Sequence, residues 1–310
     1  MKLNALGRSG LEVSALSLGT MNFGADWHGI GAIDDKTASS LIDLALERGV
    51  NLIDTADIYG RGAAEETLGR VLKGRRKRVL LATKVLGRMK DGDASSGGLS
   101  ARWIAKALDG SLKRLKTDAV DLYMPHGPDP EVPMEETFEA LAKAVKAGKV
   151  RVPGVSNFDG ARLTEALATG AARPQFDQVQ FSLAARFAEK DLVPVAGREG
   201  VSLLAWSPLA GGLLSGKYAA PGASGRRASA GAFPFVAAER GAALVEVLRR
   251  AAALDGQTCA QAALGWILGK PFVASAVLGA RTPEQLRELL DARPLSERAA
   301  SVLDRASAAV

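Results

Sequence analysis

The sequence predicts an α/β protein in which eight parallel strands alternate with helices in a (β/α)8 TIM barrel. Short apolar runs of strand length recur along the 310-residue chain, and segments with helical spacing separate them. Three consecutive runs, Val50–Ile53, Arg78–Lys84 and Ala119–Met124, end on or beside polar, titratable side chains. Sites in parallel α/β folds lie at the carboxyl ends of the strands. The same pattern therefore predicts the fold and the end of the barrel that carries the site.

The first half of the chain is expected to begin with a β-hairpin over Met1–Ser14, turning at Arg8–Gly10 and closing the bottom of the barrel. Ala15–Thr20 is expected to be the first barrel strand, and the three runs named above the second to fourth. Ser100 is suited to cap the third helix, and Gly148 to end the fourth. The four expected helices are Lys36–Arg48, Ala63–Leu72, the segment from Ser100 to Leu115, and Met134–Ala147.

The second half continues the alternation, so residues 1–310 are expected to form a single barrel domain. Pro153 is unusual inside a strand because it cannot donate a backbone hydrogen bond. A lid-like insertion between strands seven and eight is expected at 217–240, which is rich in Gly, Ala, Ser and Pro and includes Arg226 and Arg227. The remaining strands are expected at Lys149–Val155, Phe176–Gln180, Val201–Trp206 and Phe272–Leu278, with helices at Arg162–Ala168, Lys190–Arg198 and Pro283–Leu290.

Composition limits the possible classes of protein. The chain is 47% hydrophobic and 24% charged, as expected of a globular domain, and its net charge of +6 is spread along the sequence. The basic run Lys73–Arg78 is expected to be a solvated loop rather than a nucleic-acid site. The single cysteine, Cys259, stands at an expected helix start and excludes an intramolecular disulfide. With no apolar stretch near the ~20 residues of a membrane span, we expect a cytoplasmic protein, as monomer or homo-oligomer.

Four titratable residues at the predicted strand ends form a chemically coherent group: Asp54, Tyr59, Lys84 and His126. A lysine ammonium near a phenol favours the phenolate, so Lys84 is expected to lower the pKa of Tyr59. A buried lysine needs a carboxylate, which Asp54 can supply. A histidine opposite can orient and polarise a carbonyl oxygen. Each residue alone has an ordinary structural explanation, but together they predict a catalytic group without a metal.

These residues and several later motifs resemble the aldo-keto reductase superfamily over about Leu3 to Leu290, nearly the whole chain. Asp54-Thr55-Ala56 and Tyr59, with Lys84 and His126, resemble the family's catalytic tetrad. Further similar motifs are Gly154–Phe158, Ser207–Gly212 and Gly279–Leu286. The resemblance implies reduction of a carbonyl substrate by hydride transfer from a nicotinamide cofactor, with Tyr59 as the general acid.

A cofactor site is expected at the same end of the barrel. Ser156, Asn157 and Gln180 offer groups that can hold a carboxamide, and Trp206 can stack on a flat ring. Gly279, Arg281 and the helix starting at Pro283 suit a phosphate group. The resemblance implies that Arg281 grips an adenosine 2′-phosphate, which favours NADPH over NADH. It extends the cofactor-binding set to Gly19, Thr20, Met21, Asp54, Ser207, Pro208, Leu209, Gly211, Ser215, Lys217, Gln285 and Glu288.

The substrate is expected to contact His126 together with Trp27, His28 and Met89. Four residues depart from the family pattern. Leu289 replaces an asparagine expected at the adenine, and Phe181 replaces a tyrosine. Ala184–Ala185 replace bulkier, partly polar residues, which is expected to open space around the ribose or substrate.

Two other functions remain open at this point. One is a non-catalytic NADPH-binding regulatory subunit, like the potassium-channel β-subunits that share this barrel. The other is a Schiff-base aldolase that uses Lys84 as its nucleophile.

Overall fold

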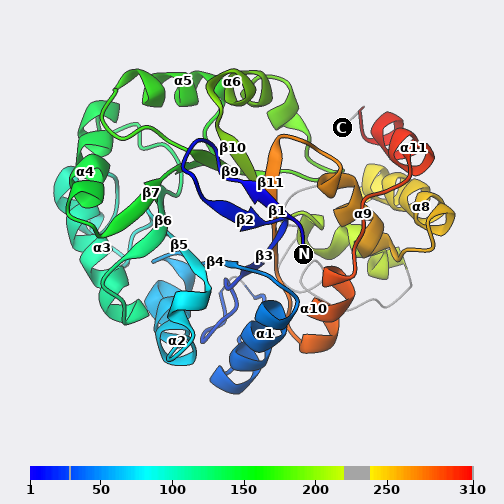
Figure 1. Cartoon of the computed structure of the whole chain (residues 1–310), viewed down its shortest axis with the longest axis horizontal. Coiled ribbons are helices and arrows are strands. Elements are labelled where there is room, and N and C mark those ends of the chain that lie inside the picture. Colours follow the sequence, from blue (N-terminus) through cyan, green and yellow to red (C-terminus); the bar gives the residue numbers. More distant parts are fainter. Residues whose placement is uncertain (28, 220–237, 309–310) are drawn as a thin grey trace.

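The protein forms the expected barrel in a computed structural model that describes residues 1–27, 29–219 and 238–308 (Figure 1). Within these residues, one parallel sheet contains β3 (Leu16–Gly19), β4 (Leu52–Asp54), β5 (Leu80–Val85), β6 (Val120–Pro125), β7 (Val150–Pro153), β8 (Val155–Ser156), β9 (Phe176–Gln180), β10 (Ser202–Trp206) and β11 (Val273–Leu278). Their order is β7-β6-β5-β4-β3-β11-β10-β9-β8. The two end strands, β7 and β8, follow each other directly in the chain. The sheet therefore closes on itself as a barrel.

The expectation of one unbroken fifth strand over Lys149–Val155 is wrong, because Gly154 divides it. β7 pairs only with β6, and β8 pairs only with β9. The joint is bridged by two backbone bonds: Gly154 N–H donates to the Tyr123 carbonyl at 3.1 Å, and Gln175 N–H donates to the Pro153 carbonyl at 3.0 Å. Pro153 has no N–H to leave unpaired at this break. The broken strand thus links both sides of the sheet.

Helices surround the sheet in Figure 1. Asp34, Ser100 and Asp159 each accept a backbone N–H near the start of the helix that follows, as their sequence positions suggest. A reciprocal pair of bonds between Thr258 and Gln261 opens the helix expected to start at Cys259. The helices are α1 (Asp35–Glu47), α2 (Ala63–Val71), α3 (Ala101–Leu115), α4 (Met134–Lys146), α5 (Gly160–Ala168), α6 (Leu192–Glu199), α8 (Ala238–Leu254), α9 (Cys259–Leu268), α10 (Pro283–Leu290) and α11 (Glu297–Ala308).

Sequence reasoning missed two helices, α8 and α11. The start of α8 overlaps the end of the low-complexity insertion at 217–240, and α11 lies beyond the eighth βα unit. Arg226 and Arg227 and most of the expected lid lie outside the described residues. None of the described helices is long and apolar enough to cross a membrane.

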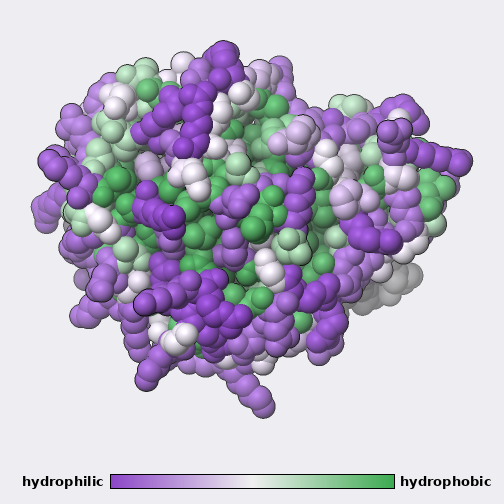
Figure 2. Space-filling view, viewed as in Figure 1, coloured by the Kyte–Doolittle hydropathy of each residue, from purple (hydrophilic) through white to green (hydrophobic). Residues whose placement is uncertain are grey.

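The N-terminal hairpin closes one end of the barrel, as expected. Its strands, β1 (Leu3–Ala5) and β2 (Glu12–Ser14), are antiparallel and lie across the barrel in Figure 1. Figure 2 shows that the exposed face around the hairpin mixes apolar patches with a hydrophilic rim. Beneath it, a second apolar cluster fills the barrel interior, and its members are Leu6, Leu11, Val13, Leu52, Ala82, Leu122, Met124, Val152, Phe176, Leu204 and Ala274.

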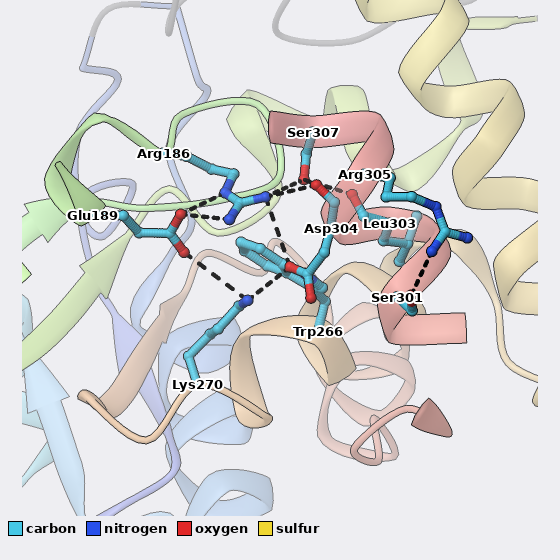
Figure 3. A network of polar contacts seen from close by, with 9 residues as sticks. All are labelled: Arg186, Glu189, Trp266, Lys270, Ser301, Leu303, Asp304, Arg305 and Ser307. Atoms are coloured by element: carbon cyan, nitrogen blue, oxygen red, sulfur yellow. Dashed lines mark hydrogen bonds and ion pairs between the residues drawn. The ribbon is translucent and has the colours of Figure 1, made fainter. Parts of the chain in front are cut away.

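The C-terminal helix α11 is attached to the barrel by a polar network (Figure 3). Arg186, in the loop after β9, donates to the Asp304 carbonyl at 3.0 Å and to the Ser307 hydroxyl at 2.9 Å. Asp304 in turn accepts the Trp266 indole N–H at 2.9 Å and pairs with Lys270 at 2.8 Å. The Arg186 guanidinium and the Lys270 ammonium also lie over the Trp266 ring. The network joins α11, α9 and the β9 loop into one unit.

The close approach at the strand break predicts a specific stability defect. A Cβ atom on Gly154 would lie 2.3 Å from the Phe176 ring, so Gly154→Ala must displace a packed side chain. We expect the free energy of unfolding to fall by about 1–3 kcal/mol in chemical denaturation. Gly197→Ala, in α6 where an added Cβ meets nothing within 4 Å, is the matched control and should be neutral or stabilising. Equal stability of both variants would contradict this account of the joint.

Candidate active site

Strand alternation brings three of the four predicted catalytic residues to one end of the barrel. Leu52 and Ala82 belong to the interior cluster, and the residues two positions further along β4 and β5 are Asp54 and Lys84. Successive side chains alternate between faces, so these polar groups continue the inward row. His126 follows β6 in the same way after Met124. An apolar plug therefore lies beneath a polar layer.

Lys84 is the centre of this layer. Its side chain has no exposed surface, and its Nζ donates to Asp54 Oδ2 at 2.7 Å, to the Thr55 carbonyl at 2.9 Å and to the Tyr59 hydroxyl at 3.3 Å. An ammonium group has three donors, and all three are used here. Although burial lowers the pKa of Lys84, Asp54 and Tyr59 raise it further, and the net direction is upward. Lys84 is held as a cation.

Tyr59 opens a 3-10 turn, η1 (Tyr59–Gly62), in which Gly60 and Arg61 adopt left-handed backbone conformations. The net pKa of Tyr59 is raised by burial, with Asp54 and Asp57 adding to the effect, whereas Lys84 opposes it. Lys84 thus lowers the pKa of Tyr59 as expected, but burial outweighs this effect, and the sequence did not reveal how far the hydroxyl is desolvated. The phenol keeps its proton at neutral pH.

His126 faces Tyr59 across the site, with the ring centroids 5.8 Å apart in an edge-to-face arrangement. Burial lowers the pKa of His126 to about 3, and the Lys84 ammonium adds to the shift. The imidazole is consequently neutral throughout the physiological range and can act as a hydrogen-bond donor without carrying charge.

Gln178 completes the layer and was missed by sequence reasoning. It is buried on β9, and its Nε2 donates to Asp54 Oδ1 at 2.7 Å. The carboxylate is thereby held from both sides, by Gln178 and by Lys84. Strand alternation could have identified it, because Phe176, Gln178 and Gln180 share one face of β9. The sequence prediction selected Gln180, which is half-buried at the end of the same row.

The groups expected to hold a carboxamide lie around Asn157. Its side chain donates to the His126 carbonyl at 2.8 Å and accepts the Trp206 indole N–H at 2.8 Å. Asn157 has φ 59°, a left-handed conformation that asparagine tolerates better than most residues. Ser156 donates its hydroxyl to the Gln178 carbonyl at 2.7 Å. The ends of four neighbouring strands thus present a flat indole beside hydroxyl and amide groups.

The segment after β10 folds into η5 (Ala210–Ser215), where Gly211 and Gly212 have positive φ angles. Ser207 is also left-handed, and the Ser215 hydroxyl donates to the Gly212 carbonyl at 2.7 Å. The Lys217 ammonium lies 5.0 Å from the centre of the Tyr218 ring. Pro208 is buried, whereas Leu209 is half-buried. The segment is a compact glycine-rich turn rather than an extended loop, as a phosphate-binding segment requires.

Arg281 follows β11 and precedes α10, which starts at Pro283 after the Thr282 cap. Arg281 is exposed, and no acidic group among the described residues pairs with its guanidinium. The backbone N–H of Arg281 donates to Gln285 Oε1 at 3.0 Å. Gly279 is open to an added Cβ. Glu288 accepts the Thr258 hydroxyl at 2.9 Å, which ties α10 to α9.

The loop after β3 covers the Tyr59 turn. Thr20 donates its backbone and hydroxyl hydrogens to the Asp54 carbonyl, and Gly19 leaves no room for a Cβ beside Val277. A Cβ on Gly60 would meet Ala25 at 2.9 Å, so the segment with half-buried Met21 and Trp27 lies against η1. Met89 lines a cavity beside Asp57. His28 lies outside the described residues.

The four departures from the family pattern are all packed in the core. Phe181 stacks on Trp266 with ring centroids 5.3 Å apart, and Leu289 is 6% exposed. Ala184 and Ala185 are buried too. The expectation that Ala184 and Ala185 open space around the ribose or substrate stays a prediction.

Comparison with known proteins agrees with this fold. The family model described as the aldo/keto reductase family matches residues 15–308. The chain therefore belongs to the aldo/keto reductase family and is an oxidoreductase of that family.

Three relatives are similar over most of the chain. An uncharacterized oxidoreductase of Bacillus subtilis, YrpG, is 39% identical, covering 96% of this chain and 92% of its own. The aldo-keto reductase YhdN of the same organism is 35% identical, covering 93% and 88%. A putative voltage-gated potassium channel subunit beta of Schizosaccharomyces pombe is 35% identical, covering 91% and 85%.

The low pKa of His126 gives a direct spectroscopic prediction. The imidazole nitrogens of His126 should keep the chemical shifts of the neutral ring from pH 8 down to pH 5, because the pKa lies at about 3. Nitrogen-15 NMR can follow this, and His28→Asn assigns the signals because the chain has two histidines. A His126 titration centred near the ordinary value of ~6.5 would show that the ring is not desolvated.

Proposed function

We propose that the protein reduces aldehydes or ketones to alcohols with NADPH, and that Tyr59 donates the proton. The proposal depends chiefly on one observation: a fully buried Lys84 that contacts both Asp54 and the Tyr59 hydroxyl. Hydride adds to the carbonyl carbon while the carbonyl oxygen takes the Tyr59 proton. The oxygen ends as a hydroxyl and the phenol ends as a phenolate, so the proton is fully accounted for.

The direction of proton transfer fits the electrostatics of the site. Tyr59 is protonated before reaction because burial raises its pKa. The phenolate formed afterwards lies beside the Lys84 ammonium, at 3.3 Å in the resting arrangement. A fixed cation at the position where negative charge develops stabilises the transition state more than the ground state. Asp54, held by Gln178, keeps Lys84 in place.

His126 is proposed to orient the substrate oxygen. A neutral imidazole can donate one hydrogen bond to a carbonyl oxygen without competing with Tyr59 for the proton-donor role. Its backbone carbonyl is fixed by Asn157 at 2.8 Å, which limits movement of the strand end. Trp27 and Met89 remain proposed substrate contacts, with the aromatic ring favouring apolar or mixed carbonyl compounds.

The residues around the tetrad fit a nicotinamide dinucleotide. When bound, such a cofactor supplies the hydride. Trp206 offers a ring face for the nicotinamide, and Ser156, Asn157, Gln178 and Gln180 offer hydroxyl and amide groups for its carboxamide.

The phosphate end of the cofactor is matched by a second set of groups. The glycine-rich η5 segment, with Ser215 and Lys217, suits the pyrophosphate. Arg281 is exposed beside the start of α10, where a phosphate monoester gains both the guanidinium and the positive helix end. Gln285 and Glu288 on the same helix are proposed to lie at the adenosine.

The contacts of Lys84 disfavour the Schiff-base alternative. A nucleophilic lysine must be an unprotonated amine with room for a carbonyl carbon. Lys84 instead donates three hydrogen bonds, has no exposed side-chain surface, and has its pKa raised.

The regulatory-subunit alternative is favoured by one observation, the similarity to the S. pombe protein named as a putative potassium channel subunit beta. Such a protein would bind NADPH through the same groups but turn over negligibly. Multiple-turnover oxidation of NADPH with a panel of aldehydes distinguishes the two.

Replacement of the proposed acid tests the mechanism. Tyr59→Phe removes only the hydroxyl, so kcat should fall about 10²–10⁴-fold while NADPH binding is retained. Tyr123→Phe is the matched control, because the buried Tyr123 hydroxyl has no hydrogen-bond partner among the described residues. Its neighbours Leu122 and Met124 belong to the interior cluster, whereas Tyr123 does not. Steady-state kinetics and cofactor-induced tryptophan quenching provide the two readouts. Wild-type kcat in Tyr59→Phe would remove Tyr59 from the acid role.

Arg281→Ala tests the cofactor preference. Loss of a charge-assisted contact worth ~1.5–3 kcal/mol should raise the Kd for NADPH about 10–100-fold and leave NADH binding nearly unchanged. Arg287→Ala, an exposed arginine on the same helix, is the control. Fluorescence titration with both cofactors measures the effect. Parallel losses for NADPH and NADH would assign Arg281 to some other part of the cofactor.

A further inference from the structure

A second cavity lies behind the tetrad, on the outer side of the barrel. It has a volume of about 250 Å³ and lies between α3 and the loop that follows β5. Asp57 forms its inner wall, and Trp103, Lys106 and Arg114 of α3 line another side. Asp57 is three residues beyond Asp54 but belongs to the opposite face of the barrel wall. Of the residues proposed to contact the cofactor or the substrate, only Met89 lines this cavity.

Two buried polar groups in this wall have no hydrogen-bond partner among the described residues. Asp57 is 1% exposed, and neither of its carboxyl oxygens makes a hydrogen bond. Trp103 is 8% exposed, and its indole N–H also lacks an acceptor. Buried polar groups are almost always hydrogen-bonded, since an unpaired one costs about 1–3 kcal/mol. Two such groups facing one cavity point to an occupant that contacts both.

The charges around Asp57 favour its neutral form. Burial raises the pKa of Asp57 to about 8, and Glu65 on α2 adds to the shift, whereas Arg114 on α3 and Lys84 on β5 oppose it. Arg114 does not compensate fully because its Nε donates to Glu65 at 2.8 Å. Tyr123 on β6, the remaining neighbour, is neutral, since burial raises its pKa well above the ordinary value. At neutral pH Asp57 can therefore donate a proton in a hydrogen bond.

The cavity consequently presents mainly hydrogen-bond donors. Protonated Asp57, the Trp103 indole and the Arg114 guanidinium all supply N–H or O–H groups. Lys90 and Lys106 add two ammonium groups, against one acidic residue, Asp93, whose Oδ1 already accepts from Ser95. A cation is disfavoured by three positive side chains, and an anion satisfies the donors.

We propose that this cavity binds a small oxyanion, a carboxylate or a phosphate, through Asp57, Trp103 and Arg114. The site is distinct from the proposed cofactor site and does not depend on the proposed reaction. It shares the segment Asp54–Tyr59 with the tetrad, so a bound anion adds a negative charge behind Tyr59. Such a charge disfavours the phenolate and makes the site suited to inhibition by the ion.

The test is an anion titration of the full-length chain, labelled with nitrogen-15 and free of cofactor. The chain has four tryptophans, and Trp103→Phe identifies the indole signal of Trp103. Sodium acetate and sodium phosphate are titrated separately, replacing sodium chloride at constant ionic strength. We expect the Trp103 signal to shift and saturate below about 50 mM with at least one anion, which distinguishes a carboxylate from a phosphate ligand.

The pH dependence tests the role of Asp57. Acetate affinity should be constant below pH 8 and fall by up to tenfold per pH unit above it, because the anion binds the protonated carboxyl. Acetate suits this measurement since it does not itself titrate there. Asp57→Asn keeps a donor at the same place, so acetate should still bind but without the decline. Asp57→Leu should abolish saturation.

Several outcomes would overturn the proposal. An unsaturated shift shared by all four indole signals indicates an effect of the medium, and no shift indicates that the cavity holds water only. Unchanged binding in Asp57→Leu excludes Asp57 from the site. Loss of the Trp103 shift in Arg281→Ala would mean that the anion binds at the proposed cofactor site, because Arg281 does not line this cavity.

Discussion

The buried pair between Lys84 and Asp54 is the interaction on which the rest of the site depends. Removing two charges from water costs several kcal/mol per ion, and only close geometry with additional hydrogen bonds offsets that loss. Here the ammonium has three acceptors and the carboxylate has a second donor in Gln178. These partners come from β4, β5 and β9 and the turn after β4. The pair can form only after the barrel is complete, so fold and site are energetically linked.

Closure of the barrel supplies the necessary alignment. Asp54 is paired in register with Ala82, two residues before Lys84, so adjacent strands set the spacing across β4 and β5. Gln178 reaches Asp54 from the opposite side of the barrel. That reach requires the sheet to curve fully round, and the break at Gly154 is where the curvature closes. The strand break at Gly154, in the barrel wall, thus contributes to the alignment of Gln178 with Asp54 in the interior.

Most of the site was predictable because a strand has a simple period. Each of Asp54, Lys84 and His126 follows an apolar residue of the plug at a spacing of two, and the sequence displays that spacing directly. The same rule applies to Gln178, but an amide inside a strand carries no chemical signal by itself. The net pKa shift of Tyr59 was not predictable, since its direction is decided by desolvation from segments distant in sequence.

The remaining errors have a related cause. The break at Gly154 depends on close contact with Phe176, which is distant from it in the sequence. Pro153 therefore indicated an irregular strand but not the residue at which the strand breaks. Helix α11 lies beyond the eight repeating units, where the alternation gives no guidance. Its attachment depends on Arg186 and Asp304 meeting across the fold. Local patterns predict elements well and predict their long-range partners poorly.

Asp54 and Asp57 show how one short segment serves two environments. Asp54 points into the barrel and pairs with Lys84 and Gln178. Asp57 faces the cavity lined by α3 and has no hydrogen-bond partner among the described residues. The backbone between them is fixed to β5, because Thr55 N–H donates to the Ala82 carbonyl and Asp57 N–H to the Lys84 carbonyl. A ligand beside Asp57 therefore has little freedom to move the tetrad. Its influence on Tyr59 must act through charge across a rigid wall, and burial strengthens such an effect by excluding water.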